Sequence, residues 1–211
     1  YYSGSRLFIT YLVHPMTAAL INKKWTLSSR PQTTVSKEHF NFETESVRDL
    51  ADGEFLVKNQ YLSFEPAQRG WLNDVRSYVP PVAIGEVMRS VAAGEVIASK
   101  HPDYQIGDRV QGGFGWQEYA ISDGSGLFPV TKVPADMPLS YPLHIYGLTG
   151  LTAYFGLLDI GQPKAGETVL ISGAAGATGS TVGQIAKLKG CRVIGIAGGQ
   201  AKCQWLIDEL G

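Results

Sequence analysis

A glycine-rich turn between two apolar stretches is the feature that most constrains the fold of this chain. Residues 168–172 predict a strand, residues 173–179 (GAAGATG) a turn, residues 180–190 a helix and residues 192–197 a second strand. The apolar positions Val182, Ile185, Ala186 and Leu188 are expected to face inward. A strand, a crossover helix and a second strand in this order predict a parallel βαβ unit.

The glycines in this unit have distinct expected roles. Gly173 permits a tight turn after the strand, and Gly176 lets the backbone approach a bound phosphate because it has no Cβ. Gly179 and Gly183 let the helix lie close to the sheet. This arrangement is typical of a site that binds a dinucleotide pyrophosphate at a helix N-terminus. A glycine-rich turn without a ligand is the alternative.

The end of the second strand indicates which dinucleotide is bound. Sites that prefer NAD usually place Asp or Glu there to bind the ribose 2′-hydroxyl. This chain has Ala197-Gly-Gly-Gln200 and then Lys202, so no carboxylate is present and a cation follows. A cation suits the 2′-phosphate of NADP(H), which a carboxylate would repel. A solvated helix lysine is the alternative for Lys202.

Composition excludes several other classes of protein. The 211 residues are 44% hydrophobic and 18% charged with a net charge of −1, which is typical of a soluble globular protein with one large or two modest domains. We expect no nucleic-acid partner, because the sequence has no cluster of basic residues of the kind that binds nucleic acid. We expect no membrane-spanning segment, because its apolar runs are short. The sparse cysteines, Cys191 and Cys203, favour a reducing, cytoplasmic setting and a packing role.

The first two thirds of the chain predict a β-rich domain. Residues 17–45 are polar and expected to be poor in strands, with an extended start at residues 25–27 and a loop at residues 30–31. The expected strands, which are short and divided by turn residues, cover residues 55–64, 84–88, 94–98, 107–111 and 116–121. This spacing favours an antiparallel barrel or sandwich, and residues 150–158 are expected to be helical. We therefore expect a first domain over residues 17–145 and a dinucleotide-binding domain over residues 146–211.

The two ends of the chain carry separate expectations. Residues 1–16 are expected to be an extension of uncertain status before a start near Met16. A doubly wound dinucleotide fold needs two mononucleotide-binding halves, and residues 146–211 offer only the first βαβα. We therefore expect the chain to be the N-terminal portion of a longer enzyme.

The residues favour hydride transfer without a metal. Residues 45–140 contain no cysteine and one histidine, His101, so no zinc site is expected. The sequence also lacks the Gly-x-Ser-x-Gly motif of hydrolases, the glycine-rich phosphate-binding loop of NTPases and a Cys-x-x-Cys pair. Without a metal, reduction of a C=C bond conjugated to a carbonyl is easier than reduction of a simple ketone, because hydrogen bonds can hold the enolate oxygen that forms. The candidate donors are Tyr61, Tyr78, Tyr119, Tyr154 and the ribose hydroxyl of the cofactor, and for each tyrosine an interior ring is the alternative.

Several motifs together resemble one family. They are residues 61–70 (YLSFEPAQRG), 78–82 (YVPPV), 85–89 (GEVMR), 111–119 (QGGFGWQEY), 150–156 (GLTAYFG) and 172–180 (SGAAGATGS). They resemble the zinc-independent medium-chain dehydrogenases/reductases, in the group of leukotriene B4 12-hydroxydehydrogenase, prostaglandin reductase, 2-alkenal reductase and curcumin reductase. The resemblance implies a GroES-like β-rich domain followed by a Rossmann domain, truncated here. It also implies NADPH-dependent reduction of enals and enones, and a full-length homodimer.

The resemblance assigns roles to individual residues. It places the phosphate-binding stretch on Gly176, Ala177, Thr178 and Gly179, and the lysine that binds the 2′-phosphate on Lys202. It places Tyr61 near the substrate as the candidate catalytic residue. The chain departs from the family pattern Asp-Pro-Tyr-Met-Arg, since residues 65–69 are Glu-Pro-Ala-Gln-Arg, so its substrate preference can differ. A quinone reductase of the same architecture and a shortened, non-catalytic nucleotide binder are the alternative functions.

Overall fold

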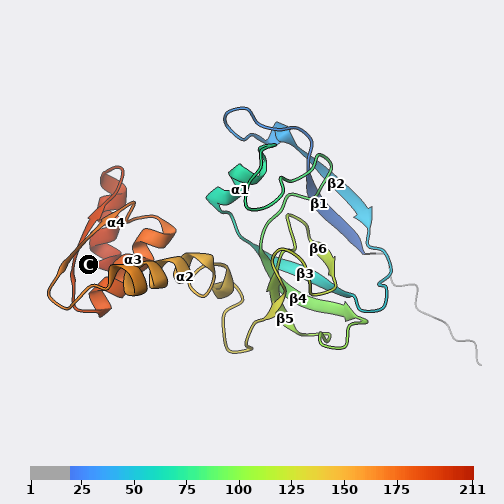
Figure 1. Ribbon diagram of the computed structural model, residues 1–211. Coiled ribbons are helices and arrows are strands. Elements are labelled where there is room, and N and C mark those ends of the chain that lie inside the picture. Colours follow the sequence, from blue (N-terminus) through green and yellow to red (C-terminus); the bar gives the residue numbers. More distant parts are fainter. Residues whose placement is uncertain (1–19) are drawn as a thin grey trace, which may run out of the picture.

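The computed structural model describes residues 20–211, which form two halves joined through helix α2 (Figure 1). The first half is β-rich and the second half is α/β, as the sequence predicts. The proposed extension at residues 1–16 lies outside the described residues. The division at residues 145 and 146 stays a prediction.

The β-rich half contains two antiparallel sheets. Strand β1 (Ile21–Leu27) pairs with β2 (Phe40–Ser46) in the first sheet. The second sheet has the order β6-β3-β4-β5-β7. Its strands are β3 (Phe55–Leu62), β4 (Ala92–Ser99), β5 (Arg109–Gly112), β6 (Tyr119–Ser122) and β7 (Thr131–Lys132). The short helices of this half are η1 (Lys37–His39), α1 (Pro66–Trp71) and η2 (Tyr141–Leu143).

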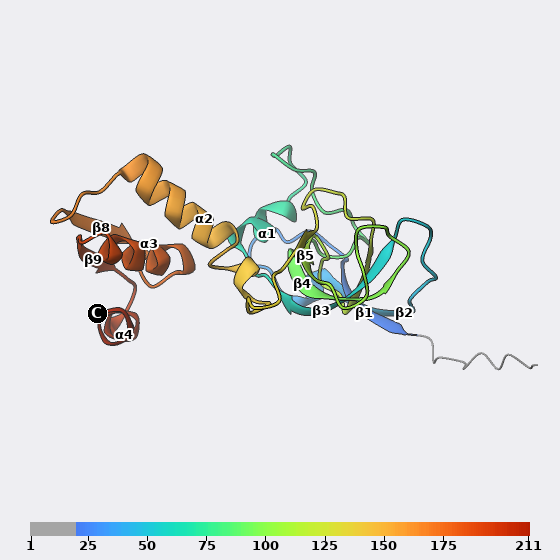
Figure 2. The same cartoon turned by 90° about the horizontal axis from the view of Figure 1, so that it is seen from below.

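Two clusters of buried apolar side chains form the core of the β-rich half. The first lies on the second sheet around Phe55, Val57, Val96 and Val110, all of them fully buried. The second connects β1 with α1 and the loop after it. Its buried members are Leu27, Trp71, Leu72, Val79, Val82 and Met88. Burial of these side chains holds α1 on the side of the β-rich half that faces α2, which both views show (Figures 1 and 2).

The α/β half contains the predicted parallel βαβ unit. Strands β8 (Thr168–Ser172) and β9 (Arg192–Ile196) run parallel, and α3 (Ala177–Leu188) connects them. Helix α2 (Leu148–Phe155) continues into η3, a π-helical segment (Gly156–Gly161), and packs against α3. Helix α4 (Gln200–Leu210) follows β9. Leu157, Ala186 and Cys191 form the buried core of this half.

Two expectations about strands in the β-rich half are wrong. Residues 17–45 are not poor in strands, because β1 and most of β2 lie there. The polar composition conceals β1, since two of its buried side chains are hydrogen-bonded polar groups: Asn22 donates to Gln117 Oε1 at 2.9 Å and Thr26 donates to Glu43 Oε1 at 2.7 Å. Residues 84–88 form no strand; Gly85 turns the chain with φ +85°, and one isolated bridge joins Val87 to Thr26.

The α/β half also corrects the sequence analysis in detail. Helix α3 begins at Ala177, three residues before the predicted start, because the helix opens directly from the glycine turn. Leu188 does not face inward: it ends the helix and is 87% exposed. Cys191 is buried as a packing residue, whereas Cys203 is exposed on α4 and does not pack in a core.

Candidate functional site

The glycine-rich turn is closed by its own backbone. Gly173 has φ +63°, a conformation that disfavours residues with a side chain. The Gly176 N–H donates to the Gly173 carbonyl at 2.8 Å, and Gly176 is the N-cap of α3. A Cβ on Gly179 would overlap the Gly173 carbonyl oxygen and lie 2.9 Å from Ala174 Cα. The first turn of α3 therefore lies against the turn only because residue 179 is glycine.

The N-terminus of α3 presents free hydrogen-bond donors. Within residues 20–211, the backbone N–H groups of Ala177, Thr178 and Gly179 have no acceptor, and no side chain caps the helix. The Ser180 and Thr181 hydroxyls donate back to the Ala177 carbonyl, at 3.2 and 2.9 Å. Free N–H groups and the positive end of the helix dipole together form a site for an anion such as a phosphate.

Lys202 lies where the sequence predicts a cation. It is exposed in the first turn of α4, the helix that follows β9 after residues 197–199. In the described part of the chain its ammonium group takes part in no ion pair. Residues 197–199, between β9 and α4, carry no carboxylate. The carboxyl edge of the parallel sheet therefore combines free N–H donors with an available cation.

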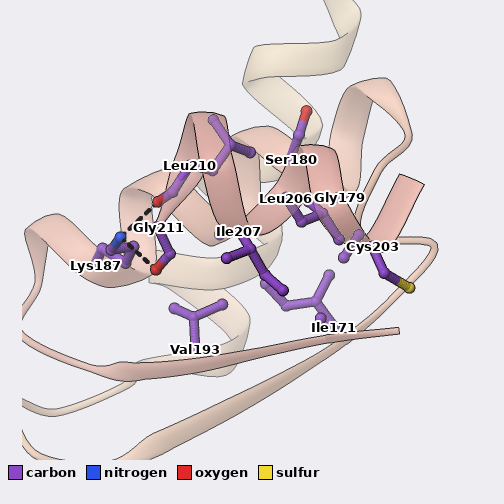
Figure 3. Close-up of a pocket in the computed structure, with 13 residues that line it drawn as sticks. Ile171, Gly179, Ser180, Lys187, Val193, Cys203, Leu206, Ile207, Leu210 and Gly211 are labelled. Atoms are coloured by element: carbon purple, nitrogen blue, oxygen red, sulfur yellow. Dashed lines mark hydrogen bonds between the residues drawn. The ribbon is translucent and has the colours of Figure 1, made fainter. Parts of the chain in front are cut away.

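A second feature of this half is a pocket of about 250 Å³ between α3, α4 and the sheet (Figure 3). Ile171 and Val193 line it from the strands, and Leu206 and Ile207 line it from α4. Gly179 is the only predicted site residue that lines this pocket. The pocket is therefore a largely apolar space beneath the helices, and it reaches the first turn of α3 at Gly179 and Ser180.

Tyr61 lies in the other half, on β3. The register of β3 against β4 shifts between Asn59 and Tyr61, and such an irregularity redirects side chains. The Tyr61 ring is 48% exposed, and its hydroxyl makes no hydrogen bond within residues 20–211. The structure therefore does not bring Tyr61 into contact with the glycine turn, but it leaves the hydroxyl free to donate.

The other candidate tyrosines differ in their surroundings. Tyr78 is 75% exposed and its hydroxyl accepts a hydrogen bond from Trp71 Nε1 at 2.9 Å. Tyr119 lines a different pocket, together with Asn22 and Gln117. Tyr154 is half exposed on α2. The hydroxyls of Tyr119 and Tyr154 also make no hydrogen bond within residues 20–211, so Tyr61 differs from them by its place on β3, next to the segment that leads into α1.

Between residues 20 and 211, no three His, Cys, Asp or Glu side chains gather closely enough to hold a metal ion. No helix in that part of the chain has the length and apolar character needed to cross a bilayer.

One group of residues beside α1 was not among the predicted site residues. Phe64, Gln68 and Trp116 line a pocket there, although all three lie in motifs that carry the family resemblance. The departure from the family pattern at residues 65–69 was the available signal, because it placed an amide where the pattern has a thioether.

Comparison with known proteins agrees with this architecture. Residues 23–130 match a family described as the N-terminal domain of oxidoreductase. The chain is 47% identical over 190 residues to NADPH-dependent curcumin reductase of Escherichia coli, covering 90% of this chain and 54% of that protein. It is 41% identical over 185 residues to prostaglandin reductase 1 of Bos taurus, covering 87% of this chain and 54% of that protein.

A solved structure extends the comparison to the fold. The crystal structure of CurA from Vibrio vulnificus in complex with NADPH superposes with a TM-score of 0.80 at 48% identity, covering 90% of this chain and 56% of that one. The chain thus spans about half the length of the curated relatives it matches. These likenesses, the β-rich half and the glycine turn together show that the chain belongs to the zinc-independent medium-chain dehydrogenases/reductases, in the group of curcumin, prostaglandin and 2-alkenal reductases.

Proposed function

We propose that the protein is an NADPH-dependent oxidoreductase that reduces the C=C bond of α,β-unsaturated aldehydes and ketones. The observation that carries the proposal is the pairing of three free N–H donors at the start of α3 with Lys202 in place of a carboxylate after β9. The names of the relatives add support, since they include an NADPH-dependent curcumin reductase and an NADP⁺-dependent 2-alkenal reductase.

The donors at this edge fit the charged parts of NADPH. In the proposal, the N–H groups of Ala177, Thr178 and Gly179 bind the pyrophosphate, with Gly173 and Gly176 shaping the turn. Lys202 binds the 2′-phosphate, for which a lysine acts as a point charge. NADPH supplies the hydride when it is bound.

The role proposed for the β-rich half is to hold the substrate carbonyl. Reduction of a conjugated C=C bond places negative charge on the carbonyl oxygen, and a nearby hydroxyl stabilises that charge by donating a hydrogen bond. Tyr61 is the proposed donor, because the residue is half exposed, its hydroxyl makes no hydrogen bond within residues 20–211, and the resemblance places it near the substrate. The substrate carbonyl then has no need of a metal ion to hold the developing charge.

The test is enone-dependent NADPH oxidation by the protein in the longest form that its gene encodes. We expect turnover with alkenals and enones, and a preference for NADPH over NADH. A preference for NADH, or turnover of alcohols only, would refute the proposal. Quinones serve as the comparison substrate, because faster turnover of quinones than of enones would favour a quinone reductase instead.

Two variants test the role of Tyr61. Loss of one donor to a developing oxyanion typically lowers kcat by about 10²–10³-fold, so we expect a decrease of that order for Tyr61→Phe. Tyr119→Phe is the matched control, because Tyr119 lies with Asn22 and Gln117 at another pocket. Equal activity of Tyr61→Phe and the unmodified protein would remove Tyr61 from the mechanism and leave the ribose hydroxyl as the candidate donor.

The proposal also covers the cellular location and the oligomeric state of the full-length protein. A cytoplasmic location and a homodimer of the full-length form are proposed from the resemblance, with a small-molecule enal or enone as the substrate. Size-exclusion chromatography with light scattering on the full-length protein measures its mass in solution, and the mass of a monomer would contradict the homodimer.

A further inference from the structure

The glycine-rich turn and helix α4 both approach β9 at the same residue, Gly195. This glycine pairs with Ile171 of β8 in the parallel sheet. A Cβ added to Gly195 would lie 2.8 Å from the Cβ of Ala174, in the turn, and 3.2 Å from Leu206 Cδ1, on α4. Carbon atoms in contact are usually about 3.5–4.0 Å apart. Both neighbours therefore occupy space that a side chain at residue 195 would need.

The Ala174 side of this contact is rigid. Ala174 is only 3% exposed, and its N–H donates to the Ile196 carbonyl at 2.9 Å, one residue beyond Gly195. Its methyl group is bonded directly to the backbone, so no side-chain rotation can move it away from residue 195. Ala174 can therefore make room there only if the backbone of the glycine-rich turn moves relative to β9.

The Leu206 side of the contact can yield. Leu206 Cδ1 is the end of a flexible side chain, and Leu206 lines the pocket of about 250 Å³ between α3, α4 and the sheet, which gives it room to rotate (Figure 3). A side chain at residue 195 would therefore displace the turn rather than α4. Lys202 precedes Leu206 by four residues, so the two side chains lie on the same side of α4. The turn would thus shift relative to Lys202 as well.

The spacing between the turn and α4 matters for a ligand with two anionic groups. The free N–H donors begin at Ala177, three residues after Ala174, and Lys202 belongs to α4. The covalent structure of NADPH limits the separation of its pyrophosphate from its 2′-phosphate, so one molecule reaches both sites only within a narrow range of spacings. An N–H···O hydrogen bond spans about 2.7–3.2 Å, so a shift of about 1 Å is enough to lose it.

We propose that Gly195 is a positioning residue for NADPH. The absence of a side chain at residue 195 lets the glycine-rich turn lie on β9, and this contact sets the spacing between the donors of α3 and Lys202. Gly195 touches neither phosphate and acts through Ala174. The inference rests on the proposed function in one respect, namely the assignment of the pyrophosphate to α3 and of the 2′-phosphate to Lys202.

Gly195→Ala tests the spacing through the preference for NADPH, measured as the dissociation constant for NADH divided by that for NADPH. The new methyl group and Ala174 must separate by about 1 Å to reach ordinary contact. We expect the preference to fall about tenfold, since a hydrogen bond to a charged group contributes at least this factor. Fluorescence titration of the folded protein, in the longest form that its gene encodes, measures both constants. A purely structural role would lower the stability and leave the ratio unchanged.

Exchanging the methyl group between the two residues gives a sharper test. Ala174→Gly removes the methyl that lies on β9, so we expect a smaller fall in the preference than in Gly195→Ala. The double variant, Ala174→Gly with Gly195→Ala, has a methyl on the strand and none on the turn, so the overlap disappears and the space is filled again. We expect it to recover most of the preference. Independent effects would instead combine, and the double variant would then have the lowest preference.

Gly156→Ala is the matched control. A Cβ on Gly156 would meet no atom within 4 Å, and the φ of this residue, −60°, suits alanine. This variant should therefore keep the preference of the unmodified protein.

The outcomes distinguish this inference from the proposed function. An unchanged preference in Gly195→Ala, or a lower preference in the double variant than in Ala174→Gly alone, overturns the positioning role even if enones are reduced. A fall that the double variant restores supports the role even if enones are not reduced. If Gly195→Ala does not fold, the double variant is compared with Ala174→Gly: a higher preference supports the role, and an equal or lower one overturns it. Equal binding of NADPH and NADH by the unmodified protein overturns both proposals.

Discussion

Replacing Gly179 with alanine tests the physical basis of the candidate site most directly. The new Cβ would overlap the Gly173 carbonyl oxygen and approach Ala174 Cα to 2.9 Å. Both obstacles are backbone atoms. The Gly173 carbonyl also accepts the Gly176 N–H at 2.8 Å, so it cannot move away without opening the turn.

Gly183, one turn further along the same helix, provides the matched control. A Cβ there would lie 3.5 Å from Ile171 Cδ1 and 3.7 Å from Val193 Cγ1, which is ordinary contact. Alanine within a helix is favoured over glycine by about 1 kcal/mol, and this gain applies to both variants. Overpacking costs about 1–3 kcal/mol, and we expect the upper part of that range at residue 179 because the obstacles are backbone.

The two variants should therefore differ by about 3 kcal/mol in the free energy of unfolding. Gly183→Ala should be about 1 kcal/mol more stable than the unmodified protein, and Gly179→Ala about 2 kcal/mol less stable. Urea unfolding followed by circular dichroism measures both. NADPH binding should weaken in Gly179→Ala only, since the free N–H groups lie next to the displaced turn. Equal stability of the two alanine variants would show that the helix does not lie as close to the turn as the structure indicates.

Three further predictions concern charge and packing. Lys202→Glu should raise the dissociation constant for NADPH roughly 10- to 100-fold, which is the usual contribution of a hydrogen bond to a charged group, and should raise the dissociation constant for NADH much less. A fluorescence titration measures both constants. Lys189→Glu is the control, because Lys189 is exposed at the end of α3. The Arg48 guanidinium donates to both Glu54 carboxylate oxygens, at 2.6 and 2.8 Å, and with the Ala51 N–H, which donates to the same carboxylate at 2.8 Å, it lowers the pKa of Glu54 from its usual 4.5 to about 2. Because this pKa is lower in the folded state, the ion pair stabilises the protein fully above about pH 4.5 and loses this effect as the pH falls toward 2. We therefore expect the melting temperature of the unmodified protein to fall more over this pH range than that of Arg48→Met. An equal fall in the two proteins would contradict the prediction. Phe55→Ala should cost about 3–5 kcal/mol in urea unfolding, because the ring is fully buried and stacks on Tyr104 at 4.2 Å between centroids, whereas truncation of the exposed Phe42 should cost far less.

Local chemistry explains why the α/β half could be predicted closely. The strand at residues 168–172 was predicted with the bounds of β8, and the turn and second strand followed in the expected order. Gly173 is needed because its φ is positive, and Gly179 is needed because the first turn of α3 lies against the backbone of Gly173 and Ala174. Both requirements involve only residues that are close in the sequence. The start of α3 was missed by three residues, because Ala177 and Thr178 carry no cap signal of their own.

The β-rich half was harder to predict because distant residues complete it. Strand β2 was missed, and β1 was anticipated only as an extended start at residues 25–27. The polar side chains that conceal β1 are satisfied by tertiary partners: Asn22 by Gln117, far along the chain, and Thr26 by Glu43 on β2. The same holds for the pocket beside α1: Gln68 lies in a motif whose unusual residue was visible, but the aromatic rings that line the pocket with it come from β2 and from residue 116.

The sequence by itself determined the parallel βαβ unit, the glycine turn and the cation after β9, because each depends on neighbours within one supersecondary motif. Tertiary structure decided which donors remain free, how exposed Tyr61 and Leu188 are, and that a pocket lined by aromatic rings forms beside α1. The physical reason is that burial and hydrogen-bond satisfaction belong to the packed whole. A residue's type limits which partners it can have, but only the surrounding elements determine whether a partner is present.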